Sequence, residues 1–140
     1  MIDRVLIDTG PMVALFSEDD QHHERCSEAL TALTPPLLTC WPVVTEAAWL
    51  LRKQPTDLHN LFKGFAGGLF ALLTLNADDL PAVADLMKRY ESSALQLADA
   101  TLAHLAEREK IRTVFTTDRR DFSILRLKRN RTLRLIPDIQ

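Results

Sequence analysis

The chain opens its first regular element with Arg4-Val5-Leu6-Ile7 and continues with Asp8-Thr9-Gly10-Pro11. A short apolar run that ends in turn residues is typical of a buried strand, and Pro11 is well placed to begin a helix that runs to Phe16. Asp8 therefore stands where a buried strand ends. A carboxylate in apolar surroundings is costly to desolvate unless it is paired, hydrogen-bonded or bound to a metal ion, so Asp8 requires a partner.

Alternating helices and strands follow this first element. The spacing of apolar residues and the Pro and Gly breaks predict helices over residues 22–33, 42–51, 57–65, 77–90 and 97–108. Short apolar runs predict further strands over residues 37–40, 69–73, 113–116 and 133–136. Because parallel strands need crossover connections, this order predicts a three-layer α/β/α fold, in which helices cover both faces of a mostly parallel sheet of about five strands.

The length and composition of the chain favour one domain that spans residues 1–140. The chain has 140 residues, 46% of them hydrophobic, and this is enough to bury a sizeable core. The apolar stretch near residues 69–75 is too short to cross a bilayer, and Met1-Ile2-Asp3-Arg4 lacks the features of a secretion signal. We therefore expect a cytoplasmic protein with no membrane partner. Cys26 and Cys40 lack CxxC spacing, so we expect packed, reduced thiols and no zinc site.

Four acidic residues that lie far apart in the chain are expected to meet at one edge of the sheet. Asp8 and Asp118 directly follow expected strands, whereas Glu46 and Asp99 lie on helices that pack against the same edge. In such folds, ligands bind beyond the carboxyl ends of the strands, where the strand order reverses. Each acid alone has an ordinary reading as a helix cap, a turn residue or an exposed carboxylate. Convergence of all four predicts a site for a hard divalent cation such as Mg²⁺.

Charge is distributed unevenly along the chain, whose net charge is -2. Residues 119–134 hold seven basic residues against one acidic residue, a local balance of +6, so the rest of the chain carries -8. A charge run is most often a solvated surface. This one follows Asp118 directly, however, and a phosphodiester substrate needs cations that hold its phosphates beside a metal site. The candidates for phosphate binding are Arg119, Arg120, Arg126, Lys128, Arg129 and Arg131.

Four segments, in order along the chain, carry a resemblance to a known family. They are Leu6-Ile7-Asp8-Thr9-Gly10-Pro11, Val43-Val44-Thr45-Glu46-Ala47-Ala48, Leu97-Ala98-Asp99-Ala100-Thr101-Leu102 and Thr116-Thr117-Asp118-Arg119-Arg120-Asp121-Phe122. Together they resemble the acidic motifs of the PIN-domain ribonucleases, most closely those of the VapC-type toxins, and they extend over essentially the whole chain. Each motif alone is weak, whereas the ordered set is fairly specific. Ala98 departs from the glycine that relatives often carry, but it removes no ligand.

The resemblance implies a PIN-like fold and an endoribonuclease that depends on Mg²⁺ or Mn²⁺ and is paired, as a toxin, with a small antitoxin protein. Carried over residue by residue, the family's acidic site corresponds to Asp8, Glu46, Asp99 and Asp118. Thr117 matches the hydroxyl residue beside the last acid, and Asp121 matches a supporting second acid. We expect Asp8 and Asp99 to bind metal directly, and the other two acids to complete its coordination or to orient the attacking water.

Other classes of protein stay open from the residues alone. One is a non-catalytic or regulatory metal-binding α/β module, such as a receiver-like domain, although no lysine follows Thr116-Thr117 as such a domain would require. A degenerate PIN fold that acts as a scaffold is disfavoured because all four acids are present. A phosphatase is disfavoured because the chain has no Asp-x-Asp motif.

The apolar residues are expected to serve mainly for packing. Trp41 and Trp49 flank the segment that carries Glu46, and we expect them in the core or in an interface rather than stacked against bases. The core is also expected to take Leu61, Phe62, Phe65, Leu69 and Phe70, with a surplus that could serve a two-fold homodimer.

Overall fold

A computed structural model describes residues 4–137 of the chain. Its strands are β1 (Val5–Ile7), β2 (Leu37–Thr39), β3 (Phe70–Leu72), β4 (Thr113–Phe115) and β5 (Arg134–Ile136). All neighbouring strands pair in parallel, in the order β3-β2-β1-β4-β5. The predicted sheet of about five mostly parallel strands is confirmed. Because the chain moves outward from β1 in both directions, the strand order reverses between β1 and β4.

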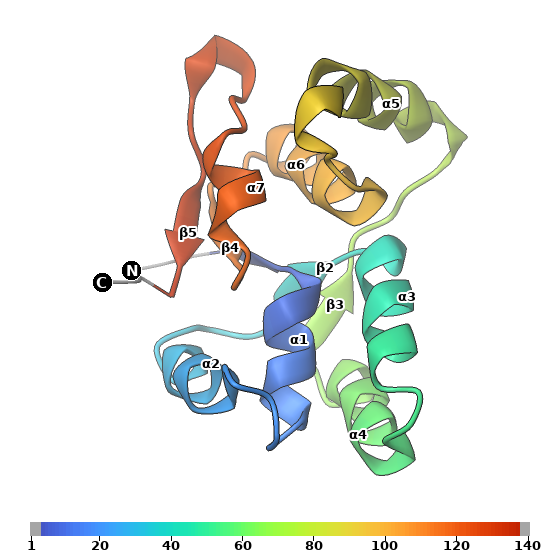
Figure 1. The fold of residues 1–140 in the computed structure, drawn as a ribbon, viewed down its shortest axis with the longest axis vertical. Coiled ribbons are helices and arrows are strands. Elements are labelled where there is room, and N and C mark those ends of the chain that lie inside the picture. Colours follow the sequence, from blue (N-terminus) through green and yellow to red (C-terminus); the bar gives the residue numbers. More distant parts are fainter. Residues whose placement is uncertain (1–3, 138–140) are drawn as a thin grey trace.

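Helices cover the two faces of this sheet (Figure 1). On one face lie α1 (Thr9–Phe16), α2 (His23–Leu30), α3 (Trp41–Leu50) and α4 (Pro55–Ala66), and on the other lie α5 (Leu80–Arg89), α6 (Leu97–Glu109) and α7 (Arg119–Ser123). The chain changes face after β3, because a right-handed crossover that returns past β1 must pass over the opposite side of the sheet. Short 3₁₀ turns at Ala77–Asp79, Glu91–Ser93 and Lys128–Asn130 complete the described elements.

Most element boundaries agree with the sequence expectation to within a few residues, and three differences are informative. Helix α1 begins at Thr9 rather than Pro11, because Asp8 is already extended and serves as the N-cap residue. Helix α2 ends at Leu30, and tighter turn hydrogen bonds carry the chain on to Leu33. Helix α7 is not expected from the sequence at all, and it immediately follows Asp118.

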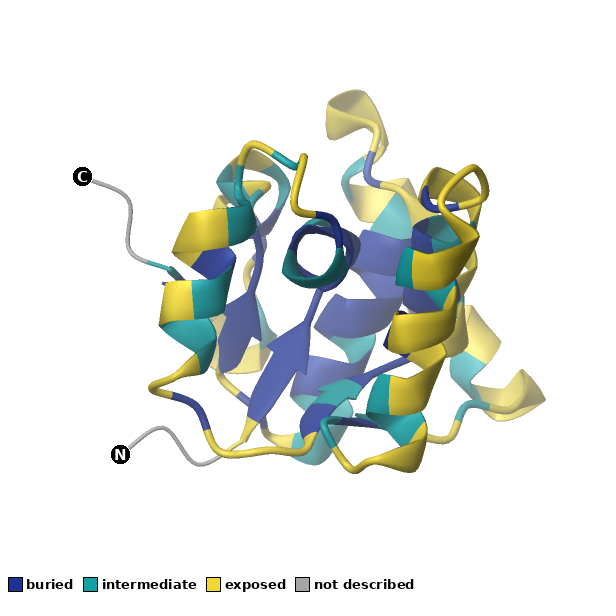
Figure 2. Cartoon of the chain, turned by 90° about the horizontal axis from the view of Figure 1, so that it is seen from below, coloured by how far each residue is buried: buried dark blue, intermediate teal, exposed yellow. Residues whose placement is uncertain are grey.

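The core lies between the strands and the inward faces of the helices (Figure 2). Leu6 pairs with Leu38 on one side and with Val114 on the other, and its side chain is fully buried. Helix α6 is buried along most of its length, including Leu102 and Leu105. Every residue from Ala98 to Ala103 is buried, so the first half of this helix lies inside the protein. Asp99 on α6 is therefore held in an apolar layer.

The tryptophans do not lie in the core, so that part of the expectation is wrong. Trp41 and Trp49 are each 63% exposed. With Thr45 they repeat at every fourth position and form the outer face of α3, while the buried residues Val44 and Ala47 turn toward the core. Phe62 on α4 is also exposed, whereas Leu61 and Phe70 are buried as expected and Phe65 and Leu69 are partly buried. The outer faces of α3 and α4 thus present apolar side chains to solvent.

Within residues 4–137, none of the helices has the length and apolar character needed to cross a membrane. Cys26 and Cys40 are both buried and free, as expected. Burial raises the pKa of the Cys26 thiol to about 11 and that of Cys40 to about 12, so both stay protonated at neutral pH.

Candidate metal-binding site

Register in the sheet brings Asp8 and Thr116 together. Ile7 pairs with Phe115 at the ends of β1 and β4, so the next residues of the two strands are neighbours, and the Asp8 N–H donates to the Phe115 carbonyl at 2.9 Å. The Thr116 hydroxyl donates to Asp8 Oδ2 at 2.9 Å. Asp8 is only 5% exposed. Burial raises its pKa to about 6, and the charges of Glu46 and Asp118 add to the rise against the hydrogen bonds from Thr9 and Thr116.

Thr116 links the ends of the two central strands, and sequence reasoning missed it. Its hydroxyl donates to Asp8 and accepts a hydrogen bond from the Asp118 N–H at 3.0 Å. A hydroxyl that bonds the backbone two residues later is a common turn motif, and Thr116 is fully buried at the end of a strand. The two-residue spacing between Thr116 and Asp118 was the signal available in the sequence. The neighbouring Thr117, selected instead, faces α1, where a Cβ placed on Gly10 would lie 2.2 Å from its hydroxyl oxygen.

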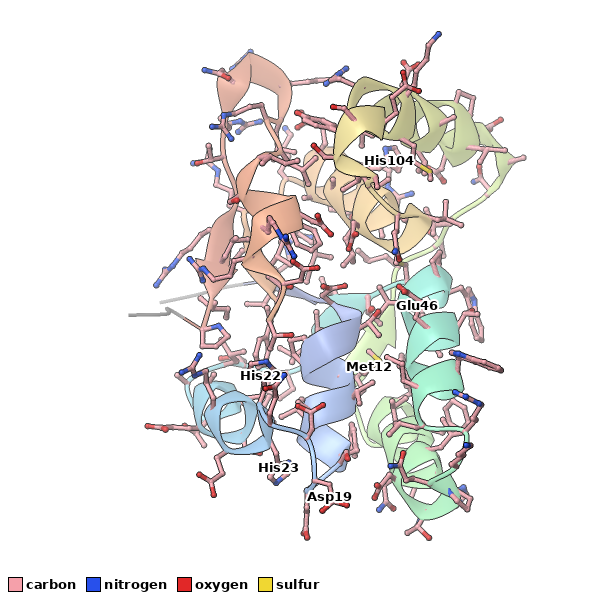
Figure 3. All side chains as sticks on the ribbon, viewed as in Figure 1. Met12, Asp19, His22, His23, Glu46 and His104 are labelled. Atoms are coloured by element: carbon pink, nitrogen blue, oxygen red, sulfur yellow. The ribbon has the colours of Figure 1, made fainter. Side chains whose placement is uncertain are left out.

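Glu46 reaches the site from α3. It is half-buried, and its Oε1 accepts a hydrogen bond from the Thr9 hydroxyl at 3.2 Å. This contact joins the second turn of α3 to the first turn of α1, and Figure 3 shows Glu46 at the end of α3 that lies beside the start of α1. Glu46 is therefore positioned by a side chain that directly follows Asp8 in the sequence.

Asp99 reaches the site from the opposite face of the sheet. It lies in the first turn of α6 and is 9% exposed. Burial raises the pKa of Asp99 to about 7, and the charges of Asp8, Asp121, Glu46 and Asp118 raise it further, in that order. The structure therefore brings Asp99 close enough to the other acids for their charges to repel one another.

Helix α7 supplies two further acids. Asp118 is its N-cap residue and is exposed, while Asp121 stands in its first turn and is half-buried. Burial raises the pKa of Asp121, and the charge of Asp118 adds to the effect. A hydrogen bond from Asp99 lowers the pKa of Asp121. Asp121 therefore lies among the acids, in contact with both Asp99 and Asp118, and is more central than the sequence suggested.

The donor chemistry of this group fits a hard cation. It offers carboxylate and hydroxyl oxygens. The nearby Cys40 thiol is buried, and burial together with the charges of Asp8 and Glu46 raises its pKa to about 12, so it does not supply the thiolate that zinc favours. Among residues 4–137, no three Asp, Glu, His or Cys side chains stand close enough together to enclose an ion by themselves. Mg²⁺ retains several water ligands and often takes only one or two carboxylates from a protein, so such an arrangement is compatible with it.

The basic residues divide into two groups. Arg119 is turned away from the acids, since its guanidinium donates to the carbonyls of Leu135 at 3.3 Å and Pro137 at 2.9 Å. Arg120 is exposed on α7. The other four candidates for phosphate binding line a cavity with none of the four acids in its walls, and they are Arg126, Lys128, Arg129 and Arg131.

A shallow apolar hollow of about 440 Å³ adjoins Glu46. Trp41 and Thr45 of α3 form one wall, and Leu97 of α6 forms the other. Leu97 is 49% exposed and immediately precedes the buried Ala98-Asp99 pair. The acids therefore lie next to an open surface with apolar walls.

Comparison with known proteins agrees with this architecture. Residues 5–128 match the model of the PIN domain family. The chain is 30% identical over 125 residues to "Ribonuclease VapC26" of Mycobacterium tuberculosis, which covers 87% of this chain and 92% of that relative.

Two solved structures share the fold at low sequence identity. The crystal structure of Mycobacterium tuberculosis VapC20, described as a sarcin-ricin loop cleaving toxin, superposes with a TM-score of 0.72 at 16% identity and covers 79% of this chain and 86% of that one. A toxin-antitoxin complex from Klebsiella pneumoniae superposes with a TM-score of 0.68 at 19% identity and covers 88% and 92%.

Proposed function

Because the chain belongs to the PIN domain family, we propose that it is a divalent-metal-dependent endoribonuclease and the toxin of a toxin–antitoxin pair. The observation that carries the proposal is the convergence of acids from four separate segments: burial raises the pKa of both Asp8 and Asp99, and the charges of the neighbouring acids raise it further. Acids that repel one another in a buried place are costly to the fold. A bound cation would offset this repulsion, so the arrangement of the acids indicates a functional site for a cation.

The proposed roles follow the burial of each acid. Asp8 and Asp99, the most buried, bind the ion directly, and Glu46 and Asp118 complete its coordination or orient the attacking water. Asp121 supports Asp99 and Asp118, while Thr117 fills the space against α1. Mg²⁺ or Mn²⁺, when bound, would neutralise charge on the phosphate and lower the pKa of the attacking water.

Thr116 and Thr9 would act as positioning residues in this site. The Thr116 hydroxyl holds Asp8 Oδ2 and the Asp118 backbone in one arrangement, and the Thr9 hydroxyl holds Glu46. Hydrogen bonds of this kind restrict the rotation of carboxylates before an ion arrives. RNA would be held next to the acids by Arg120 on α7 and, farther away, by the basic residues of the C-terminal segment.

The expected partners follow from the relatives and from the exposed apolar faces. A small antitoxin protein is proposed because one structural neighbour is a toxin–antitoxin complex. A homodimer is proposed because Trp49 and Leu50 on α3 and Phe62 on α4 are exposed, and grouped apolar side chains of this kind often mark interfaces. We also propose a cytoplasmic location, where such a nuclease meets RNA.

An RNA cleavage assay tests the activity. Purified protein is incubated with total cellular RNA, with Mg²⁺, with Mn²⁺ or with chelator, and cleavage is followed by primer extension. We expect cleavage only with metal, and a loss of more than about 100-fold in Asp99→Asn, beyond the range typical for loss of an outer ligand partner. Asp19→Asn, the same change at an exposed position, should retain activity.

Cleavage that persists in chelator, or at full rate in Asp99→Asn, would contradict the proposal. A metal-binding protein without cleavage would instead favour the regulatory module that the sequence left open.

A further inference from the structure

A cavity of about 720 Å³ lies on the α5–α6 side of the molecule, separate from the acids. We call it the α5–α6 pocket. Its walls come from α5, from the C-terminal half of α6 and from residues 126–131. Figure 3 shows His104, one of its lining residues, on α6 beside α5, well removed from Glu46 on α3. Cavities of 300–1,000 Å³ are typical of sites for small organic ligands.

The wall formed by residues 126–131 is held in place by specific contacts. The Tyr90 hydroxyl accepts a hydrogen bond from the Arg126 N–H at 3.0 Å, and Glu107 accepts one from the Lys128 N–H at 3.1 Å. The guanidinium of Arg131 lies 3.9 Å from Glu107, and the Leu127 N–H donates to the Arg131 carbonyl at 2.8 Å. The pocket is therefore formed before any ligand binds.

The rim of the pocket is strongly cationic. Besides Arg108, which is tied to Asp79 and Glu109, the lining cations are Arg89, Lys110, Arg126, Lys128, Arg129 and Arg131. The lining acids are Asp85 and Glu107. Within the part of the chain that the structure describes, Arg89, Lys110, Lys128 and Arg129 form no ion pair. Their charges remain available to an anion.

The backbone presents one of these cations at some cost. Arg129 has a φ value of 63°, in the left-handed region that side chains other than those of glycine and asparagine seldom adopt, whereas the positive φ of Lys110 is that of an ordinary helix C-cap at the end of α6. Such conformations are found more often at ligand-binding segments than elsewhere. The lining also includes the apolar residues Ala82, Leu86 and Leu127. A ligand that suits both parts carries an anionic group and a flat or apolar group.

Two segments connect this pocket to the acids. Asp99, Ala103 and Glu107 follow one another along one side of α6, and the last two line the pocket. Glu107 lies eight positions after Asp99 in the helix, a distance of about 12 Å along the axis. The chain after Asp118 likewise runs through α7 and reaches the pocket at Arg126. A strand of RNA whose phosphate lies at the acids therefore has a cationic surface within a few nucleotides.

We propose that the α5–α6 pocket binds a nucleotide unit of the RNA substrate away from the bond that is cut. The cationic rim holds the phosphates and the apolar lining residues contact the base or the ribose. This inference rests on the proposed nuclease function and deepens it. It implies that the choice of substrate depends on contacts with RNA beyond the acids, and therefore on the length of RNA that is bound. A free nucleotide offers the same chemistry, and an acidic protein segment offers only the charge.

The test measures RNA affinity in protein that cannot cleave. In an Asp99→Asn background with Mg²⁺, fluorescence anisotropy follows a labelled single-stranded RNA of about 12 nucleotides, within the site sizes known for strand-binding proteins. The pocket variant carries Arg89→Gln, Lys128→Gln and Arg129→Gln. The matched control carries Arg25→Gln, Lys53→Gln and Lys63→Gln, three exposed cations that do not line the pocket. Both variants change the net charge equally.

We expect the pocket variant to bind RNA at least about tenfold more weakly than the parent. The slope of log affinity against log salt should fall by about 2, because each of the three lost phosphate contacts on a single strand contributes about 0.7. The control should stay within about twofold of the parent.

Three other outcomes overturn the inference. Equal affinities and slopes for the pocket variant and the control would remove it while leaving the nuclease proposal intact. If the control binds adenosine monophosphate, the pocket variant does not, and the bound nucleotide does not displace RNA, the pocket would be assigned to a free nucleotide. Pocket-dependent binding of poly-glutamate without any change in RNA affinity would assign it to an acidic protein. Failure of the wild-type chain to cleave any RNA would instead remove the underlying function.

Discussion

At the scale of single residues, the molecule is defined by two carboxyl groups that ionise less readily than those of ordinary aspartates. Asp8 and Asp99 are the buried carboxylates among the described residues, and burial with like-charge repulsion raises their pKa values to about 6 and about 7. Their usual pKa is 3.8. Between these values the folded protein binds more protons than the unfolded chain does, so folding stability decreases as pH rises through this range.

A pH series of urea unfolding in chelator checks this sign. We expect the free energy of unfolding to fall between about pH 4 and pH 7, and the part due to Asp8 to be about 3 kcal/mol at 1.36 kcal/mol per pKa unit. Asp8→Asn should therefore show a flatter profile. The hydrogen bond with His104 lowers the pKa of Asp79 to about 2, so Asp79 changes the free energy of unfolding only at more acidic pH and does not obscure the contribution of Asp8. Identical profiles for the two proteins would contradict the burial argument.

The hydroxyl of Thr116 gives a second prediction at this scale. Thr116→Val leaves Asp8 Oδ2 and the Asp118 N–H without their partner, which should cost about 1–3 kcal/mol of stability and reduce cleavage about 10- to 100-fold. Thr116→Ser preserves both hydrogen bonds and should retain most of the activity. Urea unfolding and initial cleavage rates measure the two effects. If Thr117→Val were the more damaging change, the role assigned to Thr116 would be wrong.

These residues also show how far sequence reasoning reaches. The four acids were found because a carboxylate in an apolar run is costly and needs a reason. Thr116 was missed because a threonine at the end of a strand is unremarkable in sequence, and its importance arises from a contact with Asp8 across a separation of 108 residues. The basic run was found as a charge excess, but only the folded chain separates Arg119, bound to backbone carbonyls, from the cations of the pocket.

At the scale of elements, the segments that bury an apolar run or face were predictable, and helix α7 was not. The strand and helix order followed from apolar spacing, because each of those segments buries a face. Helix α7 has five residues, too few to show a period, and its only buried residue is Phe122. It is held by contacts with α6 and β5 that the sequence does not display. The start of α1 was placed late because Thr9-Gly10 has the composition of a turn.

Gly10 offers a prediction about how α1 meets the end of β4. Glycine inside a helix costs about 0.5–1 kcal/mol relative to alanine, so Gly10→Ala would ordinarily stabilise the protein. Here the added Cβ would lie 2.2 Å from the Thr117 hydroxyl oxygen. We therefore expect Gly10→Ala to destabilise the protein by about 1–3 kcal/mol. In a Thr117→Ala background the same change should become neutral or stabilising, as a double-mutant cycle of urea unfolding would measure.

At the scale of the whole molecule, different surfaces serve different proposed tasks. The acids lie where the strand order reverses, the cationic pocket lies on the α5–α6 side, and the exposed apolar residues lie on α3 and α4. Of the two expected places for the tryptophans, the core is wrong, because Trp41 and Trp49 repeat with Thr45 on the outer face of α3, and an interface stays a prediction. Apolar spacing predicts which face of a helix packs against the core. It does not show whether further apolar residues on another face are exposed and available to a partner.

The central claim, that the acids form one cation site, is tested most directly by thermal melts of wild type and Asp8→Asn, each in chelator and in millimolar Mg²⁺ or Mn²⁺, with Asp19→Asn as the matched control. In chelator, Asp8→Asn should melt above wild type, because a charge that is costly to bury and that the neighbouring acids repel is removed. Metal should stabilise wild type by about 1.4 kcal/mol at tenfold excess over Kd, and Asp8→Asn by less. A lower melting temperature for Asp8→Asn in chelator, together with no response of wild type to metal, would contradict the account.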